Sequence, residues 1–529
     1  MSTATEPVLI VGAGPVGCTL ALELARHGTP SQIIERSLAP TRHPKMDFVN
    51  ARSMELLRRL GVTGEIRRRG VAAEHPFTFH WRRALGDAPI TTWHYPSVDD
   101  HRAADARDND GSRPAEPYQR ITGALLEEIL RQRAAAHPLI ETYEGVRFTG
   151  LREEAGAVVA EVTGSTGESR ELRGSYLVGC DGANSAVRAA AGIGVDDIGP
   201  SAWHCDVYFT SDDPVLRRHG RYFLSVLTGG VTLVSRDEQD TWTAAFPLPD
   251  GVRRAADPVG ELRARLGADL RLNVLDVAYW QGRLGVAEAY RHGRVFLAGD
   301  AAHQFFPTGG HGANTGLADA ADLGWKLAAR LAGWGGEQLL DSYHAERRPV
   351  ALFNREMCFN LLEVWRRFPV LAGLGAGDEQ LAGFLAEDAY QIENVGIHCG
   401  YRYQGSPVVR HEDGAAPPWQ WRRIVPTTWP GGRAPSLRLP DGTGVYDLLG
   451  PGYTLVDLSG AKTGAALAER ATRRGIPLTY LIIDDDNVRR AWERDLVLIR
   501  PDQHVAWRDD RAPDDWDTIL DTVCGLTRH

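Results

Sequence analysis

The chain has 529 residues, of which 43% are hydrophobic and 24% are charged, and its formal net charge is −10 at pH 7. This composition is typical of a soluble globular protein, and the length predicts about three domains. The negative charge argues against nucleic-acid binding, which needs a basic face. There is no run of about 18 apolar residues and no signal-peptide pattern, so we expect neither a membrane span nor secretion.

The six cysteines lie far apart in the sequence and form no C-x-x-C pair. This spacing predicts neither a zinc site nor a disulfide framework. We therefore expect reduced cysteines in a cytoplasmic enzyme that has no metal site.

Residues 7–36 predict a dinucleotide site. An apolar strand leads into glycines with the G-x-G-x-x-G spacing, and a helix and a second strand follow. Gly12 permits the tight turn, Gly14 lets the backbone approach a pyrophosphate, and Gly17 lets helix and strand pack closely. The helix N-terminus favours phosphate, and Glu35 at the end of the second strand can bind a ribose. This stretch alone leaves NAD and FAD equally open.

The next part of the chain alternates between helical and irregular patterns. Asn50 is placed to cap a helix at residues 51–60. The polar run at 97–114 predicts a mobile surface loop, and 118–134 returns to helical periodicity.

A middle region reads mainly as strands. Hairpin patterns cover residues 146–182, and alternating strands continue over 203–246, with 277–282 as a further edge. We expect an antiparallel sheet inserted between two halves of the nucleotide-binding fold. Long helices follow from about residue 312 to 386.

The residue pattern changes twice in the last part of the chain. Residues 401–435 are rich in Pro, Trp and Gly and predict a linker that is wrapped on a surface. Residues 446–529 have β-α-β character and predict a separate small α/β domain.

Two later stretches also contain a buried strand that leads into a turn, and in both the turn contains an aspartate. The strand of YLVGCDGANSAVR ends at Asp181, and that of RVFLAGDAAHQFFPTGGHGANTG ends at Gly299-Asp300. Asp300 can bond the ribityl hydroxyls of a flavin. The helix that starts near Asn314 can face the flavin N1/C2=O edge, where the reduced ring holds negative charge.

With all three motifs in this order, the chain resembles the group A flavoprotein hydroxylases of the p-hydroxybenzoate hydroxylase type, which are single-component FAD monooxygenases. The segments YRYQGSP and PGGRAP and the α/β tail resemble the long members with a thioredoxin-like third domain. The implied fold class is α/β, with a Rossmann-like (GR2-type) FAD-binding domain, an inserted antiparallel-sheet substrate domain and a C-terminal thioredoxin-like α/β domain. The expected ranges are 1–75, 111–190 and 285–395 for FAD binding, 76–110 and 191–284 for the substrate domain, and 400–529 for the third domain.

The resemblance also implies roles for single residues. Arg52 matches an arginine that holds flavin and pyrophosphate, Gln119 a glutamine on the flavin side chain, and Asp181 a contact to both FAD and NAD(P)H. Pro307 would lie by the flavin C4a edge, where oxygen adds. The expected cofactor-binding set is Gly12, Gly14, Pro15, Gly17, Glu35, Arg36, Arg52, Gln119, Asp181, Gly299, Asp300, Pro307, Gly310, Gly312, Ala313 and Asn314.

Asp47 is, with Pro307, the candidate catalytic residue. Phenol hydroxylases of this type place an aspartate at the matching spacing before Arg52. A phenol with a pKa of about 10 reacts better as phenolate, so a positioned base helps. A free Asp is a weak base, so burial must raise its pKa or it must act by hydrogen bonding. A surface Asp near a helix start is the alternative. Tyr222 and His43 are further substrate candidates, with structural roles as their alternatives.

The implied reaction is hydroxylation of a phenolic or other electron-rich aromatic small molecule. NAD(P)H would reduce tightly bound FAD, and O2 would form a C4a-hydroperoxide that gives one oxygen to the ring. Two alternatives stay open: Baeyer–Villiger oxidation or epoxidation of a polyketide-like substrate, and a non-catalytic flavin sensor or scaffold. The expected oligomeric state is a monomer or homodimer.

Overall fold

A six-stranded sheet contains the predicted dinucleotide fingerprint. In the computed structural model, which describes residues 6–40, 43, 46–199 and 201–526, its strand order is β19-β20-β11-β1-β2-β7. β1 pairs in parallel with β2 and β11, and β11 with β20, as expected for a doubly wound fold. The strands are β1 (Val8–Val11), β2 (Ser31–Glu35), β7 (Ile140–Glu144), β11 (Tyr176–Gly179), β19 (Arg291–His292) and β20 (Val295–Leu297).

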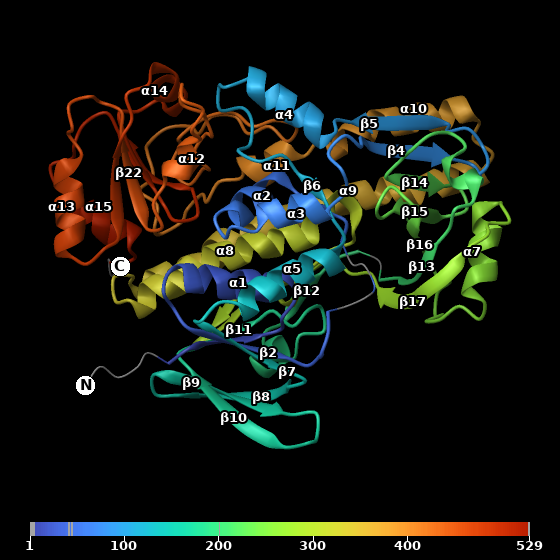
Figure 1. Ribbon diagram of the computed structural model, residues 1–529, viewed down its shortest axis with the longest axis horizontal. Coiled ribbons are helices and arrows are strands. Elements are labelled where there is room, and N and C mark those ends of the chain that lie inside the picture. The colour runs from blue at the N-terminus through green and yellow to red at the C-terminus, as the bar shows by residue number, and fades with distance from the viewer. Residues whose placement is uncertain (1–5, 41–42, 44–45, 200, 527–529) are drawn as a thin grey trace.

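Three helices form a layer beside this sheet (Figure 1): α1 (Pro15–Arg26), α5 (Gly123–Ala135) and α8 (His311–Leu331). α1 contacts the sheet and packs against both other helices. The close approach of α1 and α8 depends on a glycine, because a Cβ at Gly324 would lie 2.8 Å from the Cβ of Glu23. The shorter helices of this part are α2 (Ala51–Arg58), α3 (Thr63–Arg69) and α6 (Ala186–Ala190).

A seven-stranded sheet forms the other end of the molecule, with the order β17-β13-β16-β15-β14-β4-β5. Its pairs are antiparallel except β14 with β4, so the predicted inserted sheet is confirmed, as is the edge strand near residue 280. The outer face packs against α7 (Pro258–Leu266). The strands are β4 (Phe77–Arg82), β5 (Thr91–Tyr95), β13 (Trp203–Thr210), β14 (Leu224–Leu227), β15 (Val231–Ser235), β16 (Thr241–Pro247) and β17 (Asn273–Gln281).

Three smaller sheets complete the N-terminal two thirds. The hairpins predicted at residues 146–182 are present as the antiparallel strands β8, β9 and β10. The strands are β8 (Arg147–Glu154), β9 (Ala157–Thr163), β10 (Ser169–Gly174), β12 (Val195–Asp197), β18 (Gly285–Ala287), β21 (His303–Gln304), β3 (Phe48–Val49) and β6 (Gln119–Arg120). The β3–β6 pair places the residues after Asp47 beside Arg120.

The prediction of a loop throughout residues 97–114 was wrong, because helix α4 (Val98–Arg107) occupies its first half. Ser97 and Asp100 form a reciprocal capping box: the Ser97 hydroxyl accepts the Asp100 N–H at 3.1 Å, and the Asp100 carboxylate accepts the Ser97 N–H at 2.9 Å. The capping box thus satisfies two groups at the helix N-terminus, and several residues of the segment have high helix propensity. Together they stabilise a helix even though the segment has almost no apolar residues.

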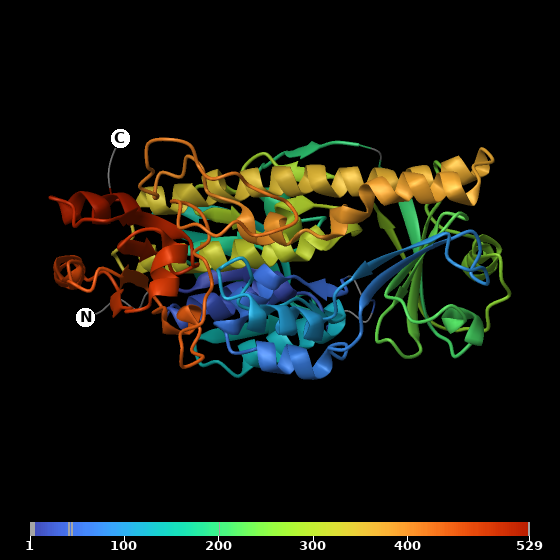
Figure 2. The ribbon, with the colours of Figure 1, turned by 90° about the horizontal axis from the view of Figure 1, so that it is seen from above.

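The helix α9 (Glu337–Gly373) connects the two ends of the molecule. Figure 2 shows it running along the long axis, from the C-terminal unit to the seven-stranded sheet. It continues into α10 (Asp378–Asp388) and α11 (Val395–Gly400), which confirms the long helical region expected after residue 312.

The C-terminal unit has the predicted β-α-β character. Its four strands lie in the order β23-β22-β24-β25, with β22 and β23 parallel and the other pairs antiparallel. The elements are β22 (Tyr453–Asp457), β23 (Leu478–Ile482), β24 (Leu496–Ile499), β25 (Val505–Asp509), α12 (Val445–Leu448), α13 (Ala465–Arg473), α14 (Asp486–Trp492) and α15 (Trp516–Val523).

The segment 401–435 is irregular, as predicted, but it lies at the surface mainly in its middle part at 410–423, and most of the remainder is buried. Tyr403 is 2% exposed and Thr428 is fully buried. The Gly431 N–H donates to the Val505 carbonyl at 2.8 Å, so the C-terminal sheet satisfies part of this backbone. A chain without regular structure can be buried when its polar groups find such partners.

A cluster of fully buried charges joins the C-terminal unit to the long helices. Arg500 donates to Glu346 at 2.6 Å and to Asp322 at 2.9 Å, and Lys326 donates to Asp322 at 2.8 Å. The Arg500 and Lys326 cations hold the pKa of Glu346 at about 2, although burial by itself would raise it. Because unpaired buried charges are strongly destabilising, this cluster specifies how the unit docks.

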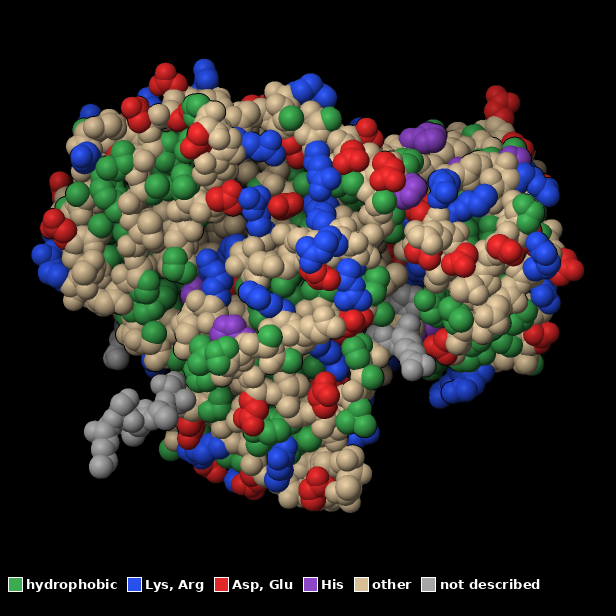
Figure 3. All heavy atoms as spheres, viewed as in Figure 1, with side chains coloured by type: hydrophobic (Ala, Val, Ile, Leu, Met, Phe, Trp, Pro, Cys, Tyr) green, Lys and Arg blue, Asp and Glu red, His purple; other side chains and the backbone are tan. Residues whose placement is uncertain are grey.

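The surface and the cysteines fit the composition. On the face in Figure 3, acidic and basic side chains are interspersed over both ends of the molecule. Within the described ranges, no helix combines the length and apolarity needed to cross a bilayer. All six cysteines are free thiols.

Candidate functional site

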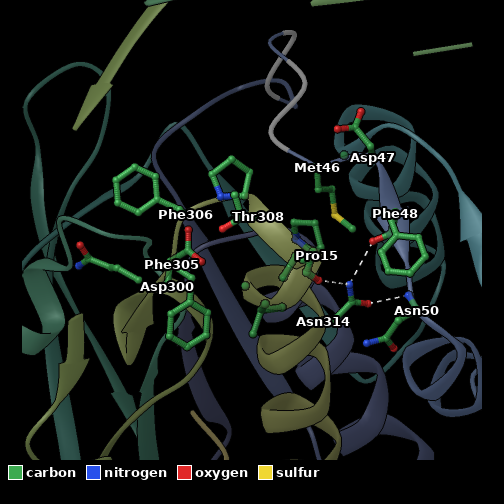
Figure 4. Close-up of a pocket in the computed structure, with 18 of the residues that line it drawn as sticks. Pro15, Met46, Asp47, Phe48, Asn50, Asp300, Phe305, Phe306, Thr308 and Asn314 are labelled. Atoms are coloured by element: carbon green, nitrogen blue, oxygen red, sulfur yellow. Dashed lines mark hydrogen bonds between the residues drawn. The ribbon is translucent and has the colours of Figure 1, made fainter. Parts of the chain in front are cut away.

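One large cavity of about 2270 Å³ reaches from the glycine turn after β1 to the inner face of the seven-stranded sheet. Pockets for drug-sized ligands usually measure about 300–1,000 Å³, so this cavity can hold a dinucleotide together with a sizeable second molecule. Figure 4 shows Asp300, Phe305 and Phe306 on one side, Met46, Asp47 and Phe48 on the other, and Pro15 between them.

The glycine turn at one end of the cavity has the geometry that the fingerprint predicts. Gly12 has φ +110°, and a Cβ there would lie 2.4 Å from the Cys180 carbonyl oxygen. A Cβ at Gly17 would lie 2.0 Å from the Gly12 carbonyl oxygen, so that position serves packing. A Cβ at Gly14 would meet nothing within 4 Å and would project into open space. Gly14 is therefore the position where a ligand can approach the backbone.

Glu35 closes this end of the cavity. Its carboxylate accepts the Ala13 N–H at 2.7 Å and the Ser37 N–H at 2.8 Å, which ties the end of β2 to the glycine turn. Each oxygen has a second lone pair, so both can still accept from a ribose diol. Arg36 follows on the cavity wall.

The two later aspartates lie in different environments. The Asp181 carboxylate lines the cavity but also caps α6, accepting the Ser185 hydroxyl at 2.5 Å and the Val187 N–H at 3.1 Å. Asp300 lines the cavity and is exposed to it. Gly299 beside it serves packing, because a Cβ there would lie 2.9 Å from the Val16 side chain.

The loop that leads into α8 provides a second helix N-terminus at the cavity. Pro307 begins a turn in which Gly309 and Gly310 have φ +78° and +67°, a region that glycine adopts without strain. Gly312 faces open space, as Gly14 does. Among the described residues, no side chain caps α8 or α1, so both helix ends offer backbone N–H groups to an anion. Ala313 and Asn314 also line the cavity.

Asn314 fastens this loop to α2 and β3. Its side chain accepts the Asn50 N–H at 2.9 Å and donates to the carbonyls of Gly310 at 2.7 Å and Phe48 at 3.1 Å (Figure 4). The three bonds satisfy most of the amide and fix the loop conformation.

The far half of the cavity is aromatic. Phe77 and Phe223 stack with ring centroids 4.6 Å apart on the inner face of the sheet. Across from them, Trp280 stacks on His204 at 4.4 Å and meets Phe306 edge-on at 5.9 Å. Such walls favour a flat aromatic guest.

One ion pair interrupts this apolar wall. The Arg236 guanidinium, which follows β15, donates to the Asp47 carboxylate and, at 2.9 Å, to the Thr243 hydroxyl. Burial lowers the pKa of Arg236 to about 9, so it is still cationic at neutral pH but its charge is poorly solvated. The pair therefore offers both a carboxylate acceptor and a guanidinium donor at the aromatic end.

His43 also lines the cavity, but it is held by the sheet. Its Nδ1 lies 3.1 Å from the Asp276 carboxylate and its Nε2 lies 3.6 Å from that of Asp206. The ring thereby links the strands β13 and β17, which supports the structural alternative for this residue.

Five expected site residues do not line the cavity: Gly17 and Gly299, which serve packing, and three residues with larger side chains. Arg52 points from α2 toward the C-terminal unit and donates to the Gln503 side chain at 2.6 Å. Gln119 donates to the Val71 carbonyl at 2.8 Å and accepts from Arg67. Tyr222 is fully buried on the outer face of the sheet, because the chain bends at Phe223 before β14 begins. In this structure these three side chains therefore contact other parts of the protein and not the cavity.

Sequence reasoning missed Arg236, Trp280 and Phe306. The only signal for Arg236 was a basic residue directly after the apolar run VTLVS, where a strand buried on both faces should end. No local pattern indicated Trp280, because its role comes from the cavity that distant elements enclose.

A doubly wound sheet, two uncapped helix ends and an aromatic chamber in one cavity define a dinucleotide-dependent enzyme that acts on a ring compound. The space over Gly14 and Gly312 and the acceptors Glu35 and Asp300 fit the phosphates and hydroxyls of FAD. Within the described ranges, no group of three or more metal-ligating side chains is arranged to hold a metal.

Comparisons with known proteins identify the family. The model of the FAD binding domain matches residues 5–354, and that of the aromatic-ring hydroxylase C-terminal domain matches residues 427–526. The chain is 34% identical to the FAD-dependent monooxygenase apdD of Emericella nidulans, over 98% of this chain and 90% of that protein. It is 32% identical to the tetracenomycin B2 monooxygenase-dioxygenase of Streptomyces olivaceus, over 98% and 97%.

Solved structures agree over the whole chain. The rebeccamycin biosynthetic enzyme RebC with reduced flavin superposes with a TM-score of 0.87 at 30% identity, covering 99% of both chains. The chain therefore belongs to the FAD-dependent aromatic-ring hydroxylases. It is an FAD-dependent monooxygenase that uses NAD(P)H and O2 to hydroxylate aromatic substrates, as the resemblance implied.

Proposed function

We propose that this enzyme hydroxylates a polycyclic phenol of the polyketide type, with the reacting phenol held at the Asp47–Arg236 pair. Two relatives support this choice: one is named for tetracenomycin B2, and the other is the aklavinone 12-hydroxylase RdmE of Streptomyces purpurascens, which is 30% identical over 98% of this chain. The size of the cavity supports a multi-ring substrate. The observation that carries the proposal is the Asp47–Arg236 ion pair, which lines the cavity next to its aromatic side chains.

The pair suits the activation of a phenol. The phenolic O–H proton moves to the Asp47 carboxylate, and the oxyanion that remains is stabilised by the Arg236 guanidinium. Burial leaves Arg236 short of solvation, so a substrate oxyanion gains a strong charge-assisted hydrogen bond there. The electron-rich phenolate ring is then the better acceptor of oxygen. The aromatic walls hold it in place and keep water out.

FAD would lie with its phosphates over Gly14 and its ring beside the loop at residues 307–314. Bound FAD, reduced by NAD(P)H, supplies the activated oxygen. The residues assigned to hold it are Gly12, Gly14, Pro15, Glu35, Arg36, Asp181, Asp300, Pro307, Gly310, Gly312, Ala313 and Asn314, all of which line the cavity. Among them, the two helix N-termini stabilise negative charge on the phosphates and on the reduced ring.

Mass spectrometry of products formed under 18O2 from a panel of polycyclic phenols and their O-methyl ethers tests this proposal. We expect one 18O in a new ring hydroxyl from phenols and little product from the ethers. A ring-expanded ester would instead indicate Baeyer–Villiger oxidation. NAD(P)H oxidation without any oxygenated product from the panel would contradict the substrate class.

The Asp47→Asn variant isolates the proton transfer. We expect it to retain FAD but to hydroxylate the best phenol at least roughly a hundredfold more slowly, as general-base removal typically does. Asp276→Asn is the matched control, because Asp276 belongs to the same sheet region but does not line the cavity. Equal rates in the Asp47→Asn variant and the wild type would remove Asp47 from the reaction.

A further inference from the structure

The turn between β24 and β25 reaches from the C-terminal unit onto α2, close to the cavity. The Arg52 guanidinium donates to the Gln503 side-chain oxygen at 2.6 Å and to the Asp502 carbonyl at 2.5 Å. Arg52 and Gln503 are each only 3% exposed. Arg52 also donates to Glu55 at 3.1 Å, and Glu55 is in turn paired with Arg433.

Gln503 has a backbone conformation that is unusual for its residue type. Its φ is +68°, in the left-handed region that glycine adopts readily and other residues rarely do. Residues held in this way persist where the surroundings determine them, and they cluster where function needs a fixed geometry. Here the strained residue presents its amide oxygen to a buried arginine.

From α2 the contacts continue to the loop at residues 307–314. Asn50 caps α2 by accepting the Ser53 N–H at 2.8 Å, and its own N–H donates to Asn314 at 2.9 Å. Asn314 donates to the Gly310 carbonyl at 2.7 Å. A shift of α2 along its axis therefore moves Asn314 and the carbonyl of Gly310 with it.

We propose that Gln503 is a positioning residue for the flavin loop, and that the C-terminal unit thereby sets the FAD site of this enzyme. The Gln503–Arg52 bond fixes α2, α2 fixes Asn314, and Asn314 fixes the loop whose N–H groups face the cavity. The inference rests on the assignment of that loop to FAD in the proposed function.

The geometry explains why this link stabilises one loop position. The side chains of Arg52, Gln503, Asn50 and Asn314 are all buried, so their bonds lie in a low-dielectric setting where misalignment is costly. Without Gln503, Arg52 keeps Glu55 and the Asp502 carbonyl, so the charge stays paired and the fold is preserved. What is lost is the bond between the Arg52 and Gln503 side chains, one of the two bonds by which Arg52 holds the turn of the C-terminal unit.

The Gln503→Gly variant separates positioning from folding. Glycine removes the side chain and relieves the left-handed backbone, so the stability of the unit should not fall. Lys462→Gly is the matched control: Lys462 has φ +56° in an exposed loop of the same unit, away from α2. FAD titration of the apoproteins and the visible circular dichroism of the bound flavin are the readouts.

We expect the FAD dissociation constant to rise roughly two- to thirtyfold in Gln503→Gly, the range seen for residues that act through a network. Lys462→Gly should bind FAD as the wild type does, and all three proteins should have similar melting temperatures. In an Asn314→Ala background, Gln503→Gly should add little, because the link is already broken.

Two results overturn the inference. One is FAD binding in Gln503→Gly that equals the wild type, and the other is a loss of affinity that is undiminished in the Asn314→Ala background. A wild-type apoprotein that binds no FAD would instead contradict the proposed function itself, so the two failures are distinct.

Discussion

Alanine substitutions at Gly14 and Gly17 should have different effects, because the two glycines of the fingerprint have different surroundings in the structure. An alanine methyl at Gly17 would lie 2.0 Å from the Gly12 carbonyl oxygen and 3.3 Å from Ile10. Overpacking costs about 1–3 kcal/mol, and contact with backbone belongs at the upper end of that range. Alanine regains about 1 kcal/mol of helix propensity, so Gly17→Ala should destabilise the apoprotein by about 2 kcal/mol.

An alanine methyl at Gly14 meets nothing within 4 Å, and its φ of −67° and ψ of 177° suit alanine. Alanine is a poorer N-cap than glycine, but it restricts the unfolded chain, so these two effects offset each other. The methyl would stand in the open space assigned to the pyrophosphate. Loss of a charged hydrogen bond costs about 1.5–3 kcal/mol, so we expect FAD to bind roughly ten- to a hundredfold more weakly.

Thermal unfolding of the apoproteins and FAD titration test both variants. Gly17→Ala should melt lower by about 2 °C without FAD. Gly14→Ala should melt like the wild type without FAD and gain less when FAD is added. The reasoning is refuted if Gly14→Ala binds FAD with unchanged affinity, or if its apoprotein melts as low as that of Gly17→Ala.

Three further variants test other parts of the structure. Burial raises the pKa of the Asp105 carboxyl to about 6, above its value in the unfolded chain. Ionisation of this carboxyl therefore destabilises the fold as the pH rises from about 4 through 6. Asp105→Asn should raise the melting temperature at pH 8 and change it little at pH 4. The Tyr222 hydroxyl is buried without a partner in the described chain, so Tyr222→Phe should leave turnover unchanged and stability equal or higher, and slower turnover would return it to the site. Arg500→Met leaves Glu346 and Asp322 short of a cation, so limited proteolysis should release the C-terminal unit faster, and an unchanged rate would contradict the docking role of the charges.

The features that could be predicted from the sequence are local. Gly12, Gly14 and Gly17 lie within six residues, and each aspartate motif directly follows its own strand. Neighbouring residues therefore determine the geometry of these motifs. The β-α-β order of the tail was readable for the same reason. The direction of Arg52 was not, because it depends on Gln503, 451 residues away.

Tyr222 and residues 98–107 show two other limits. A bend at Phe223 changes which side chains of the following strand face the cavity, and no alternation pattern records a bend. The helix α4 depends on the capping box of Ser97 and Asp100 in a segment with almost no apolar periodicity. In both places one or two local contacts determine the structure, and they override the prediction from the hydrophobic pattern.

The Asp47–Arg236 pair joins two parts of the fold as well as lining the cavity. Asp47 precedes β3 beside the dinucleotide fold, and Arg236 begins the turn between β15 and β16 of the seven-stranded sheet. Two residues further along that turn, Glu238 forms a second buried ion pair with Arg120 at 2.7 Å. A substrate oxyanion that draws Arg236 away from Asp47 would therefore break only one of the two ion pairs that join this turn to the dinucleotide fold. Since breaking a buried pair costs about 3–5 kcal/mol, the Arg120–Glu238 pair would keep the sheet in place if Asp47 and Arg236 exchanged partners as the proposed function requires.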